Sequence, residues 1–589
     1  MSRAQLAEID PVPPGRYQPA EGTPVRRLIS ERKLQAGIWV VVLGSVLAPV
    51  LPLLFASVQS KPIYASGRVF TFYAYRQLVS DPLFWGAVRN TAEYSVLTTV
   101  SSVVLGASFA VLCSRTDVAG RRVYSRLLIV PILLPPLGLI LGWNALYGDG
   151  GYAHGFIRGT LHIPLDLTTV AGMAVIGTAL AVPVTFLICQ AALSGADSSL
   201  EDAARSVGAA PLRVILSVTV PLLRPALMNS ALLVFTLSIE SLGLPLLLGG
   251  AQGHDFVASY LYKTWSNAIT PDPPMVSAGA TALLLCACTL LVLRRRLLGD
   301  ESRFVSIGGR AGSGSTLALG AVRRWIFGVM IALYIAATTF APIVALALSS
   351  FVSYLTPLIA PWHLFTLSHW RTIQHGTFAV SIQNTIEIAL VGSVVTTVAV
   401  ALATVVAHRS TFRLRRSLPF LLLFPKAIPG IIIGIGFFWT FLLVNPPGNL
   451  LRNSVWGIMV ALSIRAVTIA YFVTASAAAT ISESLDHAAR SAGASWWTTM
   501  TRVAFPILKP ALLVSFILVF ISILNDFDPA LFLVTPGNQI IGVTMLDASR
   551  QGSVGPVAAL AMVQVLLTVV AIVLAGRVFA VKMGGRRNA

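Results

Sequence analysis

The polar stretch LEDAARSVGAAPLRVILSVTVPLLRPAL, from Leu200 to Leu227, interrupts a chain that otherwise consists largely of long apolar runs. A second stretch, LDHAARSAGASWWTTMTRVAFPILKPAL, from Leu485 to Leu512, repeats it without a gap. Apolar segments resemble one another by chance, but shared Ala-Ala, Gly and Pro positions in a polar loop do not arise easily. The pair therefore indicates an internal repeat, and the question is why the polar segment is needed twice.

The residues of the first copy predict a short, exposed helix. Ser198 and Glu201 have the spacing of a capping box, and Ala203 and Ala204 are strong helix formers with small side chains. Gly208 is expected to end the helix in the left-handed conformation. Small side chains let another protein approach the backbone closely. The alternative is an amphipathic helix lying on lipid, but few large apolar residues are present to insert.

The composition identifies a membrane protein. Of 589 residues, 56% are hydrophobic and 11% are charged, and the mean hydropathy is +0.79. Runs of about 20 apolar residues recur, and spans in lipid are expected to be helical. We predict an all-α polytopic fold of about twelve transmembrane helices in two six-helix repeats. The spans are expected near 37–58, 91–114, 126–147, 167–192, 221–248, 276–295, 325–351, 384–408, 417–443, 455–478, 511–535 and 556–580.

The net charge of +19 follows the membrane topology. Lys and Arg gather in alternate loops, such as 115–126, 294–296 and 409–416, which is the positive-inside pattern. It predicts that both termini and both polar loops are cytoplasmic, and it argues against nucleic-acid binding. The four cysteines lie in or at the ends of apolar runs without a CxxC pair, so neither a zinc site nor a disulfide framework is indicated.

The chain divides into four predicted regions. These are a cytoplasmic tail at 1–36, a first repeat at 37–300, a linker at 301–324 and a second repeat at 325–589, with polar loops near 197–221 and 482–506. Further matches support the repeat, such as RNTAE at 89–93 with QNTIE at 383–387. Gly309 to Thr316 resembles a phosphate loop, but Ser315 stands where the Lys is required and no strand precedes it. We therefore predict no ATP site, catalytic residue or metal site in this chain.

The doubled segment resembles the EAA loop of ABC importer permeases, whose pattern is E-A-A, three residues, Gly, nine residues, an aliphatic, one residue, an aliphatic and Pro. The first copy has Asp202, Ala203, Ala204, Gly208, Val218, Val220 and Pro221 at these positions. The second copy has His487, Ala488, Ala489, Gly493, Val503, Phe505 and Pro506. The second copy departs from the family at His487, where the neighbouring acidic residues Glu483 and Asp486 could substitute.

The resemblance implies how the protein works. In such permeases each loop is a coupling helix that docks on an ATP-hydrolysing subunit, so two copies serve two ATPases. ATP and magnesium then belong to the partners, no cofactor is expected in this chain, and a periplasmic or extracellular binding protein delivers the cargo. The halves alternate between inward-open and outward-open states in the bacterial inner (plasma) membrane. The expected coupling residues are Glu201, Asp202, Ala203, Ala204, Gly208, Asp486, His487, Ala488, Ala489 and Gly493.

Charged and amide side chains within the spans mark a candidate translocation pathway, because burying them in lipid is costly. Glu240 falls in the fifth span, and Asn525 is its repeat counterpart beside Asp526 and Asp528. Arg465 falls in the tenth span. One interpretation is a cavity lining whose carboxylates suit a cation, including hard Fe³⁺. The other is an Arg465–Asp526 ion pair that holds helices together.

The cargo is less clearly marked than the machinery. Fused permeases of this length resemble the ferric-iron importer group, with supporting fragments at Phe235–Gly250 and Ser259–Trp265. Thiamine, polyamine, phosphonate and sugar phosphate permeases remain alternatives, and an ion-coupled secondary transporter is a further one.

Two polar patterns receive structural interpretations. Asn90 with Glu93, and Asn384 with Glu387, have the spacing of helix caps. The outer-loop histidines lack close metal-ligand spacing; they are His154, His162, His363, His369 and His375.

Overall fold

The computed structural model describes residues 24–585 except 161, 163–164, 197–198, 267–271, 299–316, 355, 357–358, 411 and 445–446. Residues 1–23 of the predicted tail, Ser198 of the predicted capping box and most of the predicted linker lie outside the described residues. Two predicted boundaries shift. The first helix begins at Pro24 rather than near 37, and the first helix of the second repeat begins at Ala321, within the predicted linker.

The fold is helical, as predicted. Within the described residues, nine helices are long and apolar enough to cross a membrane, and three bent pairs raise the possible crossings to twelve. In the first repeat the long helices are α1 (Pro24–Ser57), α3 (Pro82–Arg115), α8 (Val170–Gly195) and α14 (Pro273–Leu298). In the second they are α15 (Ala321–Ile335) continuing into α16 (Ala341–Phe351), α18 (Gly376–Arg409), α22 (Val455–Ala479), α25 (Phe505–Asn525) and α27 (Val554–Gly585).

The spans predicted at 126–147 and 417–443 are each sharply bent near the middle. Residues Arg121–Leu133 meet α6 (Pro136–Tyr147) at 104°, and residues Arg415–Ala427 meet α20 (Gly430–Leu443) at 106°. Pro135 and Pro429 take extended backbone conformations at the two breaks. Proline has no N–H and clashes with the preceding helical turn, so the helix is interrupted there. The apolar sequence continues through the break, which is why hydropathy alone does not indicate it.

The fifth spans also end earlier than predicted. In the first repeat, the predicted 221–248 begins with a 64° bend before α12 (Arg224–Ile239), and Pro245–Gly249 forms a separate π-helical turn. In the second, α25 ends at Asn525 rather than 535, and a short 3₁₀ helix follows at Asp528–Phe532. These early ends place Glu240 and Asp526 at helix C-termini, where their side chains face the space between the repeats.

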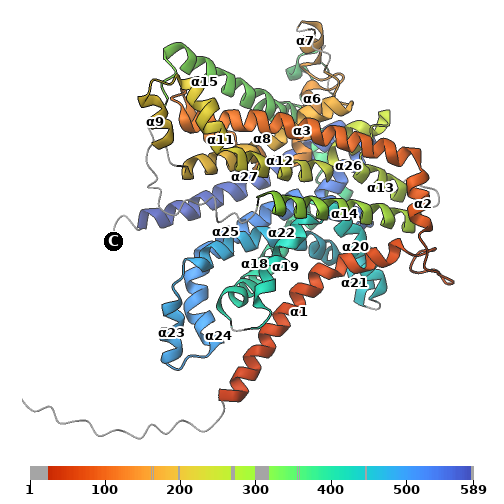
Figure 1. The fold of residues 1–589 in the computed structure, drawn as a ribbon. Helices are drawn as coiled ribbons and strands as arrows, with labels where there is room; N and C mark the ends of the chain where they lie inside the picture. Colours follow the sequence, from red (N-terminus) through yellow and green to blue (C-terminus); the bar gives the residue numbers. More distant parts are fainter. Residues whose placement is uncertain are drawn as a thin grey trace, which may run out of the picture.

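The first spans are exchanged between the repeats. Helix α1 packs along α20 of the second repeat, and α16 packs along α6 of the first. Figure 1 shows α1 beside α20 and α21, far from α15, which lies near α9. Both crossings use a glycine, because a Cβ on Gly436 would overlap the Pro49 carbonyl and a Cβ on Gly142 would overlap the Pro342 carbonyl.

At both crossings, side chains of one repeat donate hydrogen bonds to backbone carbonyls of the other. These carbonyls lack a donor within their own helix because a proline follows one turn later. Pro342 cannot donate to Ala337 or Thr338, and these carbonyls instead accept from Tyr147 (2.9 Å) and Trp143 (3.1 Å) of the other repeat. Pro52 likewise leaves the Ala48 carbonyl to the Thr440 hydroxyl. The exchange is therefore held by specific hydrogen bonds as well as by apolar contact.

Replacing Trp143 with Phe tests this bonding. The variant keeps an aromatic ring in a site that is 4% exposed but leaves the Thr338 carbonyl without its donor. An unsatisfied buried carbonyl costs roughly 1–3 kcal/mol, so the thermal midpoint in detergent should fall. Trp325→Phe is the matched control, because Trp325 is 66% exposed. Equal midpoints for the two variants would contradict the proposed role of this bond.

The capping interpretation of the two Asn-x-x-Glu patterns is wrong. Helices α3 and α18 begin at Pro82 and Gly376, so Asn90 and Asn384 lie inside them. Asn90 donates to the Asp255 carbonyl (3.1 Å), and Asn384 donates to the carbonyls of Gly537 and Gln539 (3.2 and 2.9 Å). Each asparagine therefore fixes the segment before a short helix, α13 (Val257–Ser266) in the first repeat and α26 (Ile541–Arg550) in the second.

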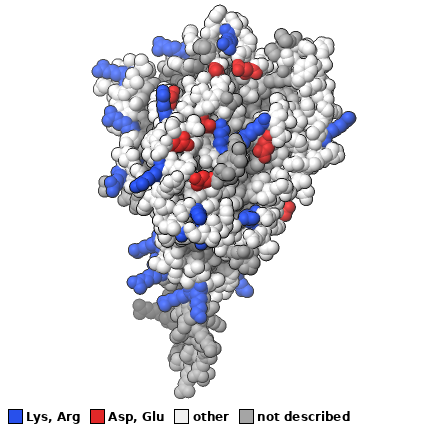
Figure 2. Space-filling model, turned by 90° about the vertical axis from the view of Figure 1, so that its right-hand side faces the viewer, with Lys and Arg blue, Asp and Glu red and all other residues white. Residues whose placement is uncertain are grey.

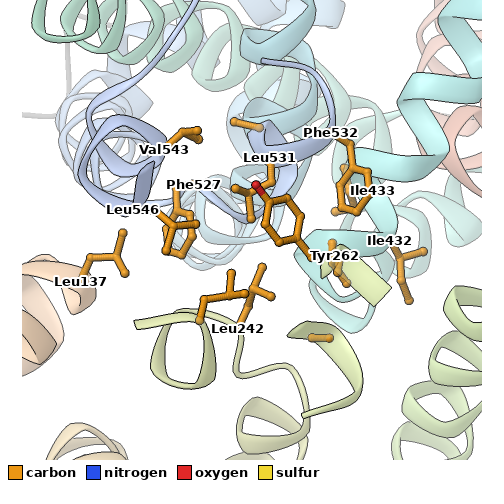
Figure 3. Close-up of a cluster of buried hydrophobic side chains, with 14 of the residues drawn as sticks. Leu137, Leu242, Tyr262, Ile432, Ile433, Phe527, Leu531, Phe532, Val543 and Leu546 are labelled. Atoms are coloured by element: carbon orange, nitrogen blue, oxygen red, sulfur yellow. The ribbon is translucent and has the colours of Figure 1, made fainter. Parts of the chain in front are cut away.

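An apolar core joins the repeats beside α13 and α26. Figure 3 shows side chains from both repeats converging there, with Leu242 and Tyr262 facing Phe527 and Phe532. The rings of Tyr262 and Phe532 meet edge to face at 5.9 Å. This core closes the space between the repeats on the side of α13 and α26.

Candidate functional site

Two short helices lie outside the bundle, one in each copy of the doubled segment. They are α9 (Ser199–Ser206) and α23 (Glu483–Ser491), and Figure 1 shows both at the same end of the molecule. We call them the loop helices. Gly208 and Gly493 follow them with φ of 83° at each, which confirms the left-handed end predicted at Gly208 and shows the same end in the second copy. A Cβ at either glycine would meet open space.

The predicted coupling residues divide between two faces of the loop helices. Asp202, Ala203 and Gly208 are exposed on the first, and His487, Ala488 and Gly493 on the second; Ala204 and Ala489 are half-buried. Asp202 pairs with Arg205 at 3.3 Å on the outer surface. Each helix thus presents small side chains outward, as a docking surface requires.

Glu201 and Asp486, by contrast, turn inward. The Glu201 side chain is 7% exposed and its Oε1 accepts from Thr219 at 2.8 Å. Asp486 lies at the matching position of the second copy, and its side chain is 19% exposed. These two predicted coupling residues therefore do not lie on the exposed face of the loop helices. Their carboxylates contact arginines of the membrane helices.

The charged residues predicted within the spans form one cluster between the repeats. Arg465, on α22, pairs with Glu240 (3.0 Å), Asp526 (3.1 Å) and Asp528 (3.2 Å). The Arg465 side chain is only 13% exposed, and Glu240 has one oxygen, Oε1, that is buried without a hydrogen-bond partner. The pairing with Asp526 anticipated from sequence is present, and two further carboxylates share the same guanidinium.

Only one of these ion pairs crosses between the repeats. Glu240 ends α12 of the first repeat, whereas Arg465, Asp526 and Asp528 all belong to the second. Among the salt bridges of the described residues, Glu240–Arg465 is the one that joins the two halves. Any motion that separates the halves at this level must break it.

Asn525, the repeat counterpart of Glu240, lies beside the cluster and serves a different partner. Its Nδ2 donates to the Leu133 carbonyl (3.4 Å), immediately before the break between α5 (Val130–Leu133) and α6. Its Oδ1 accepts from Thr568 at 3.2 Å. Asn525 therefore supplies a donor to the broken span of the opposite repeat.

Lys426 belongs to the cluster but was not predicted as a site residue. It lies in the 3₁₀ turn Phe424–Ala427 at the break of the second repeat, and its side chain is exposed to the cavity described next. It makes no hydrogen bond or ion pair with the described residues. A lysine within an apolar run was the available signal. Its repeat counterpart, Ile132, carries no charge.

A cavity of about 530 Å³ extends from the charged cluster toward the end that carries the loop helices. Its lining follows α25 back from Asp526 to Leu518 and α12 back from Glu240 to Val234, in both cases toward the loop helices. Leu242 and Phe527 of the apolar core in Figure 3 also line this cavity, which therefore lies between the charged cluster, the core and the middle of the spans.

Other polar groups of the described chain do not assemble into a metal site. No group of three or more His, Cys, Asp or Glu in the described ranges is arranged to hold a metal ion. His154 approaches Asp149 at 3.7 Å and His369 contacts the Val352 carbonyl. In the charged cluster the carboxylates face Arg465 instead.

The paired loop helices and the cavity between two repeats define an importer permease, and comparison with known proteins agrees. The family model described as "Binding-protein-dependent transport system inner membrane component" matches residues 102–297 and 399–580, one match in each repeat. The chain belongs to this family of ABC importer permeases. This assignment displaces the alternative of an ion-coupled secondary transporter.

Individual relatives differ in cargo. A ferric transport permease of Haemophilus influenzae is 24% identical over 83% of this chain and 76% of its own length. The ferric transport system permease protein FbpB of Actinobacillus pleuropneumoniae is 23% identical over 87% of this chain and 75% of its own. A 2-aminoethylphosphonate transport permease of Salmonella typhi is 29% identical, but the match covers 32% of this chain and 66% of that protein.

Proposed function

We propose that this chain is the permease of an ATP-driven importer whose cargo is ferric iron. The observation that supports this cargo is that two of the relatives similar over most of the chain are ferric transport permeases. A binding protein delivers the cargo, and two copies of an ABC ATPase dock on α9 and α23. ATP and magnesium act in those subunits.

The distribution of charge supports an orientation in the inner membrane. The Arg-rich loops adjoining Arg115 and Arg409 lie at the end that carries the loop helices, so this end and both termini are assigned to the cytoplasm. Figure 2 shows the opposite end, where Asp and Glu gather near the middle and several Lys and Arg lie at the rim. We assign the docking of the binding protein to that end.

The glycines after the loop helices provide the test of ATPase coupling. Gly208→Val and Gly493→Val should lower uptake per ATP hydrolysed, because valine disfavours the left-handed conformation by about 1–2 kcal/mol and adds bulk beside the docking face. Uptake and hydrolysis are measured together in proteoliposomes. Gly576→Val, at a helical glycine with open space around it, is the control. Normal uptake in both loop variants would remove the coupling assignment.

The charged cluster supports a cationic cargo. Glu240, Asp526 and Asp528 are hard oxygen donors at the floor of the cavity, and they outnumber the two cations, Arg465 and Lys426. A cation arriving from the binding protein would meet this net negative charge when the halves open the other way. Its contact with the carboxylates is transient, since the cargo is transported and not kept.

One observation favours a second cargo, an oxyanion such as a phosphonate. Lys426 faces the cavity without an ion-pair partner among the described residues, and a phosphonate permease is among the relatives. An ammonium group in this position can bind a phosphonate oxygen. Lys426→Met separates the two proposals, because it should abolish uptake of an oxyanion and leave uptake of ferric iron within about threefold.

The experiment that decides the cargo uses the partner. The binding protein is crosslinked to the permease in cells, recovered and analysed for bound ligand by elemental analysis and mass spectrometry. Stoichiometric iron supports the proposal. A phosphonate or another organic ligand without iron overturns the ferric assignment, keeps the importer assignment and makes Lys426 the first residue to test.

A further inference from the structure

The inward-facing acids of the loop helices contact two arginines at equivalent places. Arg115 is the last residue of α3, and its Nε lies 3.2 Å from Glu201. Arg409 is the last residue of α18, and its Nη1 lies 2.5 Å from Asp486. The two arginine side chains are 12% and 5% exposed. Each second span therefore ends in a buried guanidinium bound to the loop helix of its own repeat.

Both arginines also bind the end of the fourth span. Arg115 Nη2 donates to the carbonyls of Leu193 (3.0 Å) and Ala196 (3.5 Å), at the end of α8. Arg409 Nη2 donates to the carbonyls of Ala478 (3.5 Å) and Ile481 (2.5 Å), at the end of α22. The last carbonyls of a helix have no partner within it, and a cation there is favoured by the helix dipole.

The two sets of contacts correspond contact by contact. The register that aligns Ala203 with Ala488 also aligns Leu193 with Ala478, Ala196 with Ile481 and Glu201 with Asp486. Three matched contacts in two segments of different sequence indicate an arrangement retained in both repeats. The family's loop pattern does not include this arginine, which lies far from the loop in sequence.

We infer that Arg115 and Arg409 are positioning residues that join each loop helix to the ends of the second and fourth spans of its repeat. When the loop helix moves, these contacts move the ends of both spans with it. Without them, the segments that connect the loop helix to the spans could bend and leave the spans in place. This inference rests on the proposed function, in which the ATPases move these helices. The guanidinium fits the task because it is always charged and offers donors in several directions.

The two junctions are not equally strong. Glu201 also accepts from Thr219, which is fully buried, whereas Ala504 stands at the matching position of the second repeat. Asp486 is shorter than Glu201, and a cavity of about 270 Å³ lies beside it, lined in part by Arg409 and His487. Arg409 is the only side-chain partner of Asp486 among the described residues. Loss of Arg409 should therefore reduce coupling more than loss of Arg115.

The test compares variants of the complete importer, with its ATPases and binding protein, in proteoliposomes. Arg115→Gln and Arg409→Gln should each lower the ratio of cargo transported to ATP hydrolysed by about tenfold or more, within the usual range of coupling between sites. Arg121→Gln is the matched control. Arg121 lies in the same loop and donates to the Thr116 carbonyl (2.8 Å), and among the described residues it makes no hydrogen bond or ion pair with α9. It should leave the ratio unchanged.

A conservative replacement separates positioning from general stability. Arg115→Lys keeps a cation that can donate to Glu201 or to the carbonyls at the end of α8, so it should recover part of the ratio lost in Arg115→Gln, which a purely structural defect would not allow. Glu201→Gln provides a milder change if an arginine variant fails to fold. A ratio in Arg115→Gln and Arg409→Gln equal to that of Arg121→Gln overturns the inference.

A second measurement does not depend on cargo. Hydrogen exchange across residues 193–206 of the purified permease should be faster in Arg115→Gln than in Arg121→Gln. Equal exchange rates overturn the inference even if transport is never reconstituted. Absence of ATP-driven uptake by the unmodified importer, with faster exchange in Arg115→Gln, instead rejects the proposed function and leaves the junction intact.

Discussion

Replacing Arg465 with Met is expected to destabilise the permease by roughly 3–5 kcal/mol, because it leaves buried carboxylates without their counter-ion. Glu240, Asp526 and Asp528 all direct oxygens at this one guanidinium. The methionine fills a similar volume, so the loss measures charge and not a cavity. The free energy of unfolding is followed by denaturant or thermal titration in detergent.

The control and the rescue for Arg465 follow from the same geometry. Arg122→Met removes an arginine from an exposed position on α4 (Arg121–Leu127) and should change stability by less than about 0.5 kcal/mol. Neutralising the acids as Glu240→Gln, Asp526→Asn and Asp528→Asn in the Arg465→Met background should restore most of the loss. If Arg465→Met is as stable as Arg122→Met, the cluster contributes no ion pairing and the described pathway floor is wrong.

Replacing Gly436 with Ala is expected to have the second large effect. A Cβ at this position would overlap the carbonyl oxygen of Pro49, and that neighbour is backbone, which cannot rotate away. Overpacking of this kind costs about 1–3 kcal/mol or more. We expect a lower thermal midpoint and less folded protein in the membrane, since α1 and α20 must separate.

Gly44→Ala is the matched control for the exchanged first span. Gly44 lies on α1, near Pro49, and a Cβ there would have no neighbour within 4 Å. Alanine also favours the helix by about 1 kcal/mol over glycine, so this variant should be neutral or more stable. Gly142→Ala, at the corresponding crossing with Pro342, should repeat the loss. A stable Gly436→Ala variant would show that the first span does not pack as described.

Local sequence was sufficient for the features that depend on neighbouring residues. The repeat, the loop helices and their left-handed glycines follow from composition and spacing over a few turns. The charged residues of the spans could also be selected as candidate site residues, because a charged side chain within the bilayer is costly and is usually functional. The same rule applies to Lys426, which was not predicted as a site residue.

Features that depend on distant packing could not be predicted. The inward direction of Glu201 is set by Arg115, which lies 86 positions earlier (201 − 115) on another helix. Asn90 and Glu93 have the spacing of a cap, but Asp81 and Pro82 had already started the helix, and Asp81 caps it. The broken spans show a further limit, because hydropathy measures the cost of leaving lipid and says nothing of the direction in which a helix runs.

The exchange of the first spans has a consequence for how the protein is made. In the folded protein the Thr440 hydroxyl donates to the Ala48 carbonyl, and Thr440 is synthesised 392 residues after Ala48. At about 5–20 residues per second, that interval is roughly 20–80 s. Throughout it, α1 lies in the membrane with a carbonyl that lipid cannot satisfy and without α20, whose Gly436 packs against Pro49. Folding of this permease can therefore be completed only late in synthesis. A chain that stops after its first repeat leaves α1 in the membrane without its partner helix α20.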